Sequence, residues 1–152
     1  LWEANMEVLD PEHSGINLFD DDWKIYSRNS GMTGHKIGSN AVVENSMITD
    51  GCRIDGSIKH SILFSGVSVE EGAEIEDAVV MGGTVIKKGA SVKHCIVAEN
   101  VVIGENAVVG EMPKDGAGSV ATIGSGVYIG DGAKGGPAAM IDQNVKDGEE
   151  QW

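Results

Sequence analysis

The sequence is poor in the residues that most binding and redox functions require. It has 2 Cys and no paired C-x-x-C spacing, so neither a disulfide framework nor a zinc knuckle is expected. It has 11 Lys and Arg but 24 Asp and Glu, and the resulting formal charge of −13 argues against nucleic acid and anionic membranes as partners. No apolar run is long enough to span a membrane and no signal peptide opens the chain, so we expect a cytoplasmic protein.

Aromatic residues are also few, whereas glycine is abundant, with 22 residues in a chain of 152. Each glycine in a helix interior costs about 1 kcal/mol relative to alanine. The composition therefore favours a turn-rich β architecture over a helix bundle, and the length suits one domain with one core.

An internal repeat defines that architecture. Four segments share one plan, in which an aliphatic and a charged residue precede Asn, Asp or His, a small residue and two aliphatics. They are VENSMI (43–48), IKHSIL (58–63), IEDAVV (75–80) and VKHCIV (92–97). Aliphatic anchors recur in steps of five or six within two runs, first at 37, 43 and 48 and then at 63, 69, 75, 80, 86, 92, 97, 103 and 109. A period of about six grouped in threes predicts short parallel strands on three faces of a prism, which is a parallel β-helix of hexapeptide repeats.

Equivalent residues of successive coils should stack into columns, with neighbouring residues of a column about 4.8 Å apart. Three columns hold residue types that enter the left-handed backbone region at low cost, and we expect them at corners. Their members are Asn45, His60, Asp77 and His94; Gly51, Gly66, Gly83 and Asn100; and Asn40, Gly72, Gly89 and Asn106.

The pair His94 and Cys95 could be read as a reactive thiol with its base or as a metal site. The columns favour another interpretation, because His94 falls at a corner and Cys95 follows Ser46, Ser61 and Ala78 in a column of small residues. A buried cysteine of this kind is usually inert. Cys52 belongs to a different column, so no disulfide is predicted between Cys52 and Cys95.

A fourth column alternates in charge up four coils. It contains Glu44, Lys59, Glu76 and Lys93. Opposite charges on neighbouring strands contribute a few tenths of a kcal/mol each, so this column is interpreted as a solvated face that disfavours register slips.

The repeats divide the chain into three parts. Residues 1–36 hold a short helix at WEANM and an extended connector with apolar side chains, and they are expected to be the end of a domain whose remainder is missing, followed by its connector. Residues 37–145 are predicted to form the β-helix domain, with a loop excursion at 110–119. Residues 146–152 are predicted to be an acidic, poorly ordered tail. The chain opens on Leu rather than Met, so we expect it to be part of a longer protein.

The motifs WEANM (2–6), INLFDDDWKIYS (16–27) and the run NSMITDGC to EDAVVM (45–81) resemble the carboxy-terminal part of bacterial glucose-1-phosphate adenylyltransferase, also called ADP-glucose pyrophosphorylase. The resemblance covers residues 1–110 and continues loosely beyond them. It implies a left-handed parallel β-helix, preceded by a missing α/β nucleotidyltransferase domain. Residues 1–36 would then be the end of that catalytic domain and its connector. It also implies a reaction in which ATP and glucose 1-phosphate yield ADP-glucose and pyrophosphate for glycogen synthesis.

The resemblance implies that the cofactors, Mg²⁺ and ATP, bind the missing catalytic domain and that none binds this fragment. We therefore assign no catalytic, cofactor-binding or metal-binding residue here, and expect the isolated fragment to be inactive. The implied partners are its own N-terminal catalytic domain and further subunits, in a homo- or hetero-tetramer formed through the β-helix. Family β-helices also help bind anionic effectors, but the basic residues here are scattered, with Lys87 and Lys88 the only adjacent pair.

Three alternatives stay open. The chain could come from a noncatalytic partner subunit of the same enzyme. It could be a hexapeptide-repeat acyltransferase, in which case His35, His60 or His94 would have to serve as the base. It could also be a purely structural solenoid.

Overall fold

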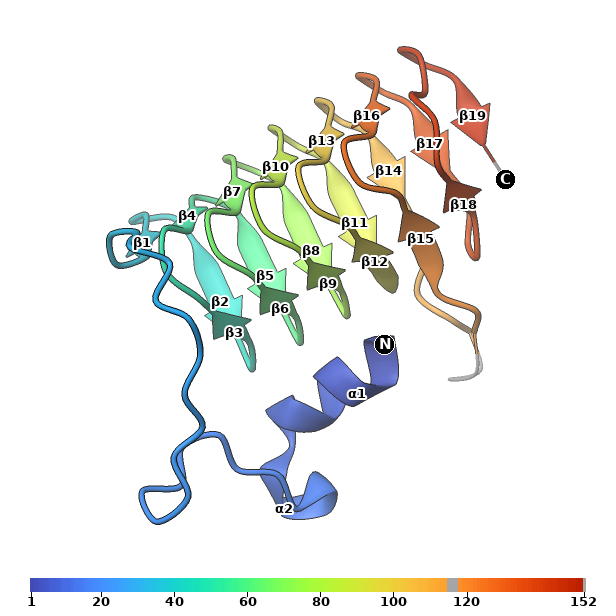
Figure 1. Cartoon of the computed structure of the whole chain (residues 1–152). Helices are drawn as coiled ribbons and strands as arrows, with labels where there is room; N and C mark the ends of the chain where they lie inside the picture. The colour runs from blue at the N-terminus through green and yellow to red at the C-terminus, as the bar shows by residue number, and fades with distance from the viewer. Residues whose placement is uncertain (115–117, 152) are drawn as a thin grey trace.

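The computed structural model describes residues 1–114 and 118–151. From residue 36 the chain winds into a solenoid of three parallel sheets (Figure 1), which confirms the predicted β-helix. The first sheet contains β1 (Lys36–Ile37), β4 (Arg53–Ile54), β7 (Ser68–Val69), β10 (Val85–Ile86), β13 (Val102–Ile103) and β16 (Tyr128–Ile129).

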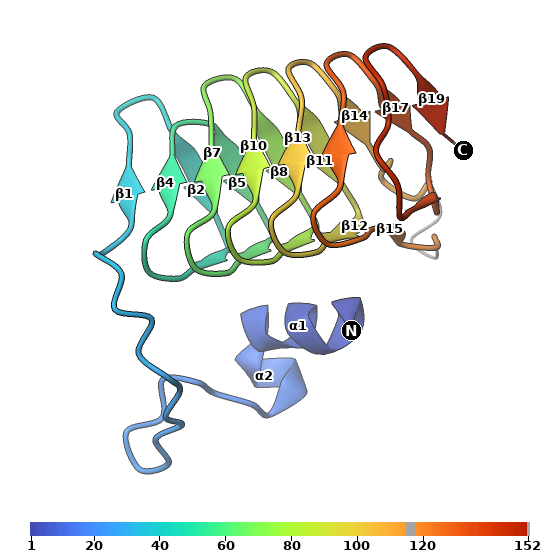
Figure 2. The same ribbon diagram turned by 45° about the horizontal axis from the view of Figure 1, so that its top comes forward.

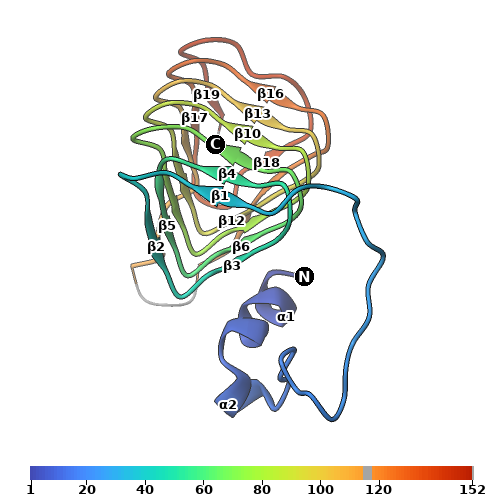
Figure 3. The same cartoon turned by 90° about the vertical axis from the view of Figure 1, so that its left-hand side faces the viewer.

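The other two sheets are built in the same order along the solenoid. The second sheet contains β2 (Val42–Glu44), β5 (Ser57–Lys59), β8 (Glu74–Glu76), β11 (Ser91–Lys93), β14 (Val108–Val109), β17 (Lys134–Gly135) and β19 (Glu150–Gln151). The third sheet contains β3 (Met47–Ile48), β6 (Ile62–Leu63), β9 (Val79–Val80), β12 (Cys95–Val97), β15 (Ala121–Ile123) and β18 (Met140–Ile141). In Figure 3, which looks onto the β1 end, the chain runs anticlockwise from β1 to β3 as it recedes, so the coil is left-handed.

Strand pairing places the predicted anchors in three inward columns. The first runs through Ile37, Ile54, Val69, Ile86, Ile103 and Ile129. The second runs through Val43, Ile58, Ile75, Val92, Val109, Gly135 and Gln151. The third runs through Ile48, Leu63, Val80, Val97, Ile123 and Ile141. From the second coil onward these aliphatic residues are buried and form one continuous core.

Two inward residues, Ile54 and Ile58, were absent from the predicted anchor series because they are only four positions apart. Gly56 lies between them and tightens this corner. A Cβ at this position would collide with the carbonyl oxygen of Ala73, so only glycine fits.

The predicted corners adopt the left-handed backbone with one exception. Asn45, His60, Asp77 and His94 have φ of 38°, 44°, 57° and 45°. Asn100 and Asn106 have φ of 56° and 55°, close to the values of the glycines in their columns. The prediction for Asn40 was wrong, since it is not among the positive-φ residues. In the same column, the amides of Gly89 and Asn106 donate to the Glu71 and Lys88 carbonyl oxygens of the preceding coil, whereas no coil precedes Asn40.

The solenoid extends further than the sequence indicated. Val145 bridges to Ile129, and β19 pairs with β17, so residues 146–151 continue the coil and do not form a tail. Gly148, with φ of 68°, turns the corner, and its amide donates to the Asp131 carbonyl oxygen at 2.9 Å. The edge of β17 presents unpaired backbone N–H and C=O groups, and pairing with β19 satisfies them. Trp152 lies outside the described residues.

The predicted excursion at 110–119 leaves the coil between β14 and β15, and its residues 115–117 lie outside the described part. At the other end of the chain, α1 (Trp2–Met6) is followed by the 3-10 helix η1 (Glu7–Leu9) and by α2 (Pro11–Ser14). The connector at 16–35 contains neither helix nor strand, and its apolar side chains are exposed. Figure 2 shows both helices beside the coils. None of the helices described is long and apolar enough to cross a membrane.

Candidate functional site

The N-terminal helix packs on the outer face of the third sheet (Figures 1 and 2). Outward residues of a sheet are normally polar or solvated. Here Ile62 on β6 and Val79 on β9 point outward and are nevertheless buried, as is Met6 of α1. The helix therefore covers an apolar patch of the sheet, which supplies the stability that a helix this short lacks in water.

Trp2 fastens the helix to a corner of the solenoid. Its indole Nε1 donates to the Asp77 carbonyl oxygen at 2.9 Å, across 75 positions of sequence. Its ring meets the His94 imidazole edge to face, with centroids 4.8 Å apart and planes at 66°. Such aromatic contacts contribute about 0.5–1.5 kcal/mol beyond the area they bury.

Three corner residues beneath Trp2 form a bonded column, His60–Asp77–His94. The two carboxylate oxygens of Asp77 are shared, with Oδ1 2.8 Å from His60 Nδ1 and Oδ2 2.6 Å from His94 Nδ1. On its other side His94 Nε2 donates to the Gly118 carbonyl oxygen at 3.2 Å, which ties the excursion to the same corner. The column thus joins three successive coils, the helix and the excursion.

This arrangement does not suit His94 as a general base. Its side chain is 6% exposed, and both ring nitrogens are engaged by protein acceptors. A base must reach the proton it removes from a bound acceptor, either directly or through one water. His60 is partly exposed but also bonds to Asp77, and His35 lies exposed just before β1. The structure therefore supports the corner interpretation, and the link that it shows between His60 and His94 runs through the Asp77 carboxylate.

The two cysteines are buried and unpaired with each other, as predicted. Burial, with a smaller contribution from the Asp77 charge, raises the pKa of the Cys95 thiol well above its ordinary value. Burial likewise raises the pKa of Cys52, whose Sγ lies 3.2 Å from the Phe64 carbonyl oxygen. Thiols held in the neutral form are poor nucleophiles, so neither cysteine is a catalytic candidate.

The charged column is in the predicted register, with Glu44, Lys59 and Glu76 on adjacent strands. The Lys59 Nζ lies 3.9 Å from Glu44 Oε2 and 4.0 Å from Glu76 Oε1. Lys93 differs, because its Nζ turns to Glu74 at 3.6 Å. The exposure of these groups makes the pairs weak.

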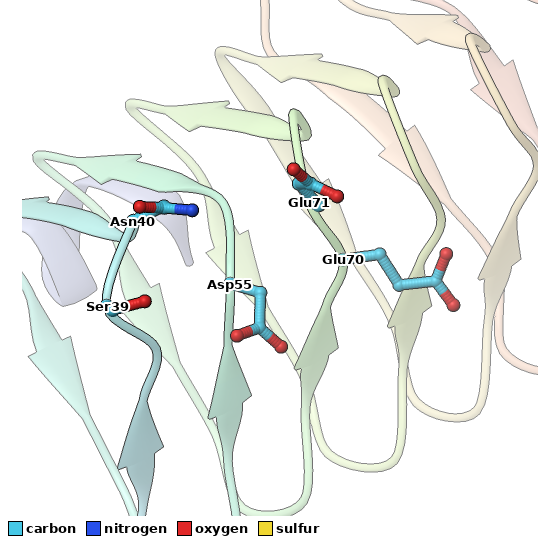
Figure 4. A pocket seen from close by; sticks show the side chains of 5 residues that line it. All are labelled: Ser39, Asn40, Asp55, Glu70 and Glu71. Carbon is cyan, nitrogen blue, oxygen red and sulfur yellow. The ribbon is translucent and has the colours of Figure 1, made fainter.

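An acidic hollow of about 370 Å³ lies at the first corner of the early coils (Figure 4). Its lining residues are Ser39, Asn40, Asp55, Glu70 and Glu71. Glu70 accepts the Lys88 backbone amide at 2.9 Å, so part of its charge supports the next coil. Among the residues that the structure describes, no group of three or more His, Cys, Asp or Glu side chains could hold a metal ion.

A family model described as "GlmU-like, C-terminal hexapeptide" matches residues 30–130, more than half of the chain. The chain belongs to the GlmU-like C-terminal hexapeptide family. Two curated relatives, one from Bacillus thuringiensis and one from Bacillus cereus, are both named glucose-1-phosphate adenylyltransferase. Each is 53% identical to this protein over 73 residues, which make up 48% of this chain and 19% of the relative. The chain therefore spans about a fifth of the length of these relatives.

Among solved structures, this member of the hexapeptide family matches the acetyltransferase domain of PglB from Neisseria gonorrhoeae, with a TM-score of 0.36 and 22% sequence identity. That match covers 80% of this chain and 55% of the other. A likeness at this level says nothing about a shared activity.

The sequence alone did not reveal the contact between Trp2 and the corner column. Stacking at intervals of 17 residues places His60, Asp77 and His94 in one column and could have indicated their hydrogen bonds. No pattern in a single sequence indicates that a helix 75 positions away lies on that column.

Proposed function

We propose that this chain is the carboxy-terminal β-helix part of a glucose-1-phosphate adenylyltransferase, and that its role is assembly and positioning. The names of the two Bacillus relatives support the reaction class. The short share of their length that is matched supports a further domain elsewhere in the protein. That domain would bind ATP, glucose 1-phosphate and Mg²⁺, and would be the chain's first partner.

The observation that carries the positioning role is the clamp on α1. Trp2 is held through its indole nitrogen by Asp77 and through its ring by His94. A domain continuous with this helix would be held in a fixed orientation relative to the solenoid. Holding reacting groups in one geometry is worth a large share of an enzymatic barrier, so a rigid mount is a functional contribution even without catalytic groups.

The residues described here contribute no chemistry to the proposed reaction. In that reaction a sugar phosphate oxygen attacks the α-phosphorus of ATP and pyrophosphate leaves, while bound Mg²⁺ would stabilise the developing charge. The one adjacent pair of lysines in the sequence, Lys87 and Lys88, is engaged by other side chains. The Lys87 Nζ lies 5.8 Å from the Tyr128 ring centroid, and the Lys88 Nζ lies 4.0 Å from Glu71 Oε2. We therefore propose that the solenoid serves subunit assembly, in a cytoplasmic tetramer, and we favour this role over effector binding.

The test is pyrophosphate release from ATP and glucose 1-phosphate, with Mg²⁺, by the polypeptide encoded by the complete gene. We expect turnover by the complete polypeptide and none by residues 1–152 alone. Thiol release from acetyl-CoA is measured in parallel with a panel of sugar acceptors. Acyl transfer without pyrophosphate release would refute the proposal, and a complete polypeptide inactive in both assays would assign it to a noncatalytic partner subunit.

A further inference from the structure

His94 lies between two hydrogen-bond acceptors. Its Nδ1 lies 2.6 Å from Asp77 Oδ2, and its Nε2 lies 3.2 Å from the Gly118 carbonyl oxygen. A carbonyl oxygen can only accept, so Nε2 carries a proton. A neutral imidazole has one N–H and one bare nitrogen, and that bare nitrogen would face the carboxylate with no hydrogen between them. Both bonds form together only when the Asp77–His94 pair holds one proton more than a neutral ring and a carboxylate do.

The surroundings of His94 suit a positively charged ring. The additional proton belongs on Nδ1, because an imidazole holds a proton more tightly than a carboxylate does. The side chains of His94 and Asp77 are only 6% and 11% exposed, and a buried charge is tolerated when an opposite charge is bonded to it. The Trp2 ring, 4.8 Å away between centroids, lies within the range of a cation–π contact.

The bond to Gly118 ties the excursion to this corner. Among the described excursion residues, 111–114 and 118–119, it is the one hydrogen bond to the coils. Gly118 also lies close to Pro113, since a Cβ on Gly118 would be 2.6 Å from the Pro113 Cβ. The two described sides of the excursion therefore contact each other, and His94 holds one of them to the solenoid.

We propose that His94 is a proton-dependent latch, which holds Gly118 to the corner while both ring nitrogens carry protons and releases it when one proton is lost. The proton leaves from Nε2, because the Nδ1 proton is retained by the stronger bond to a carboxylate. A hollow of about 470 Å³, lined by His94 and Gly118 among others, lets that proton pass to solvent. The bare Nε2 then faces a carbonyl oxygen, and two acceptors cannot bond.

The direction of the pH dependence follows from proton binding. The latched state holds one proton more than the released state, so it is favoured as the pH falls and lost as the pH rises. The indole of Trp2 donates to the backbone carbonyl oxygen of Asp77, a bond in which no group titrates. Release should therefore affect Gly118 and leave α1 on the sheet.

Other titratable or charged groups lie around this corner. They are Glu3 and the Leu1 amino group from α1, His60 and Asp77 from the column, Glu111 and Lys114 from the excursion, and Glu76, Lys93 and Cys95 from the adjoining strands. The Lys93 Nζ is paired with Glu74, and the buried Cys95 thiol stays neutral. His60 and the Leu1 amino group can titrate near neutral pH, so the test separates both from His94.

The test follows two NMR signals of residues 1–152 from about pH 5.5 to about pH 9.5, a range that spans histidine titration. One is the nitrogen signal of the His94 ring, and the other is the carbonyl carbon of Gly118. At the acidic end we expect both ring nitrogens to carry protons. As the pH rises, Nε2 should lose its proton, and the Gly118 carbonyl shift should move upfield with the same midpoint as its hydrogen bond is lost.

Two variants assign the transition to His94. His94→Asn keeps a residue that accepts the left-handed corner but cannot titrate, so the Gly118 transition should disappear. A transition that survived would belong to another group, such as the Leu1 amino group. The matched control is His60→Asn, the same substitution at the other end of the bonded column, and the Gly118 transition should persist in it.

The proposal is overturned if the Gly118 carbonyl signal of the wild-type chain does not change over this pH range. It is also overturned if that signal changes with a midpoint different from that of the His94 ring, or changes equally in His94→Asn. Should His94→Asn fail to fold, the comparison of the two wild-type midpoints decides alone. Only this chain is measured, so the result is independent of the proposed reaction.

Discussion

His94 allows the cost of the corner backbone to be separated from the cost of its side-chain contacts. We compare His94→Asn with His94→Val. Both substitutions remove the bond to Asp77, the bond to Gly118 and the contact with Trp2. They differ in backbone preference, since φ at this position is 45° and Asn enters that region far more readily than a β-branched residue.

The lost contacts should cost about 1.5–3 kcal/mol in either variant, as expected for hydrogen bonds to a charged and nearly buried partner. Valine should add a further 1–2 kcal/mol or so, the cost of holding a side chain with a Cβ in the left-handed region. With a urea m-value of about 2 kcal/mol/M, that extra cost lowers the unfolding midpoint of His94→Val by about 0.5–1 M relative to His94→Asn.

The assay is urea unfolding followed by circular dichroism. Lys93→Val serves as the control, because it places the same side chain on the preceding strand residue, where the backbone is extended. We expect a small change for that variant. Equal midpoints for His94→Asn and His94→Val would refute the corner explanation of this column.

Three further predictions concern the helix, the charged column and the thiols. Trp2→Phe keeps a ring against His94 but loses the indole donor, so hydrogen exchange of α1 should quicken modestly, and Trp2→Ala should quicken it more. Replacing Lys59 and Lys93 with Glu should lower the melting temperature by a few degrees at low ionic strength and less at high salt, and no change at low salt would count against the charged column. Cys52 and Cys95 should resist alkylation in the folded protein at pH 8 and react in urea, because burial raises both thiol pKa values; fast labelling of the folded chain would contradict this.

The sequence predicted the solenoid well because its physics is local and repeated. The sequence shows an aliphatic anchor every five or six residues and a Gly, Asn, Asp or His at each corner. Both patterns can be recognised without knowledge of the tertiary contacts. Where this regularity lapses, prediction was less accurate. Gly56 shortens one corner, Asn40 lacks the left-handed backbone of the other residues in its column, and residues 150–151 pair with the edge of β17.

The contacts that support the proposed role could not be predicted in the same way. The clamp on Trp2 depends on the path of a connector whose sequence has no repeat, and on the curvature of a surface formed by several coils. Exposure of Ile37 and Val43 is also a property of the assembled end, since both residues fit the anchor pattern as well as their buried counterparts do.

The central claim is that this chain contributes structure and assembly, and no catalytic group. It is tested most directly by the rate of pyrophosphate release, at saturating ATP and glucose 1-phosphate, of the complete polypeptide carrying His60→Asn and His94→Asn together. Both residues are corner positions where Asn is compatible with the backbone, and Trp2 keeps its indole bond to the Asp77 carbonyl oxygen, which still holds α1. A fall in rate of no more than about tenfold is therefore predicted. A loss of a hundredfold or more in a folded, normally assembled variant would show that these histidines take part in the reaction, and would contradict the account.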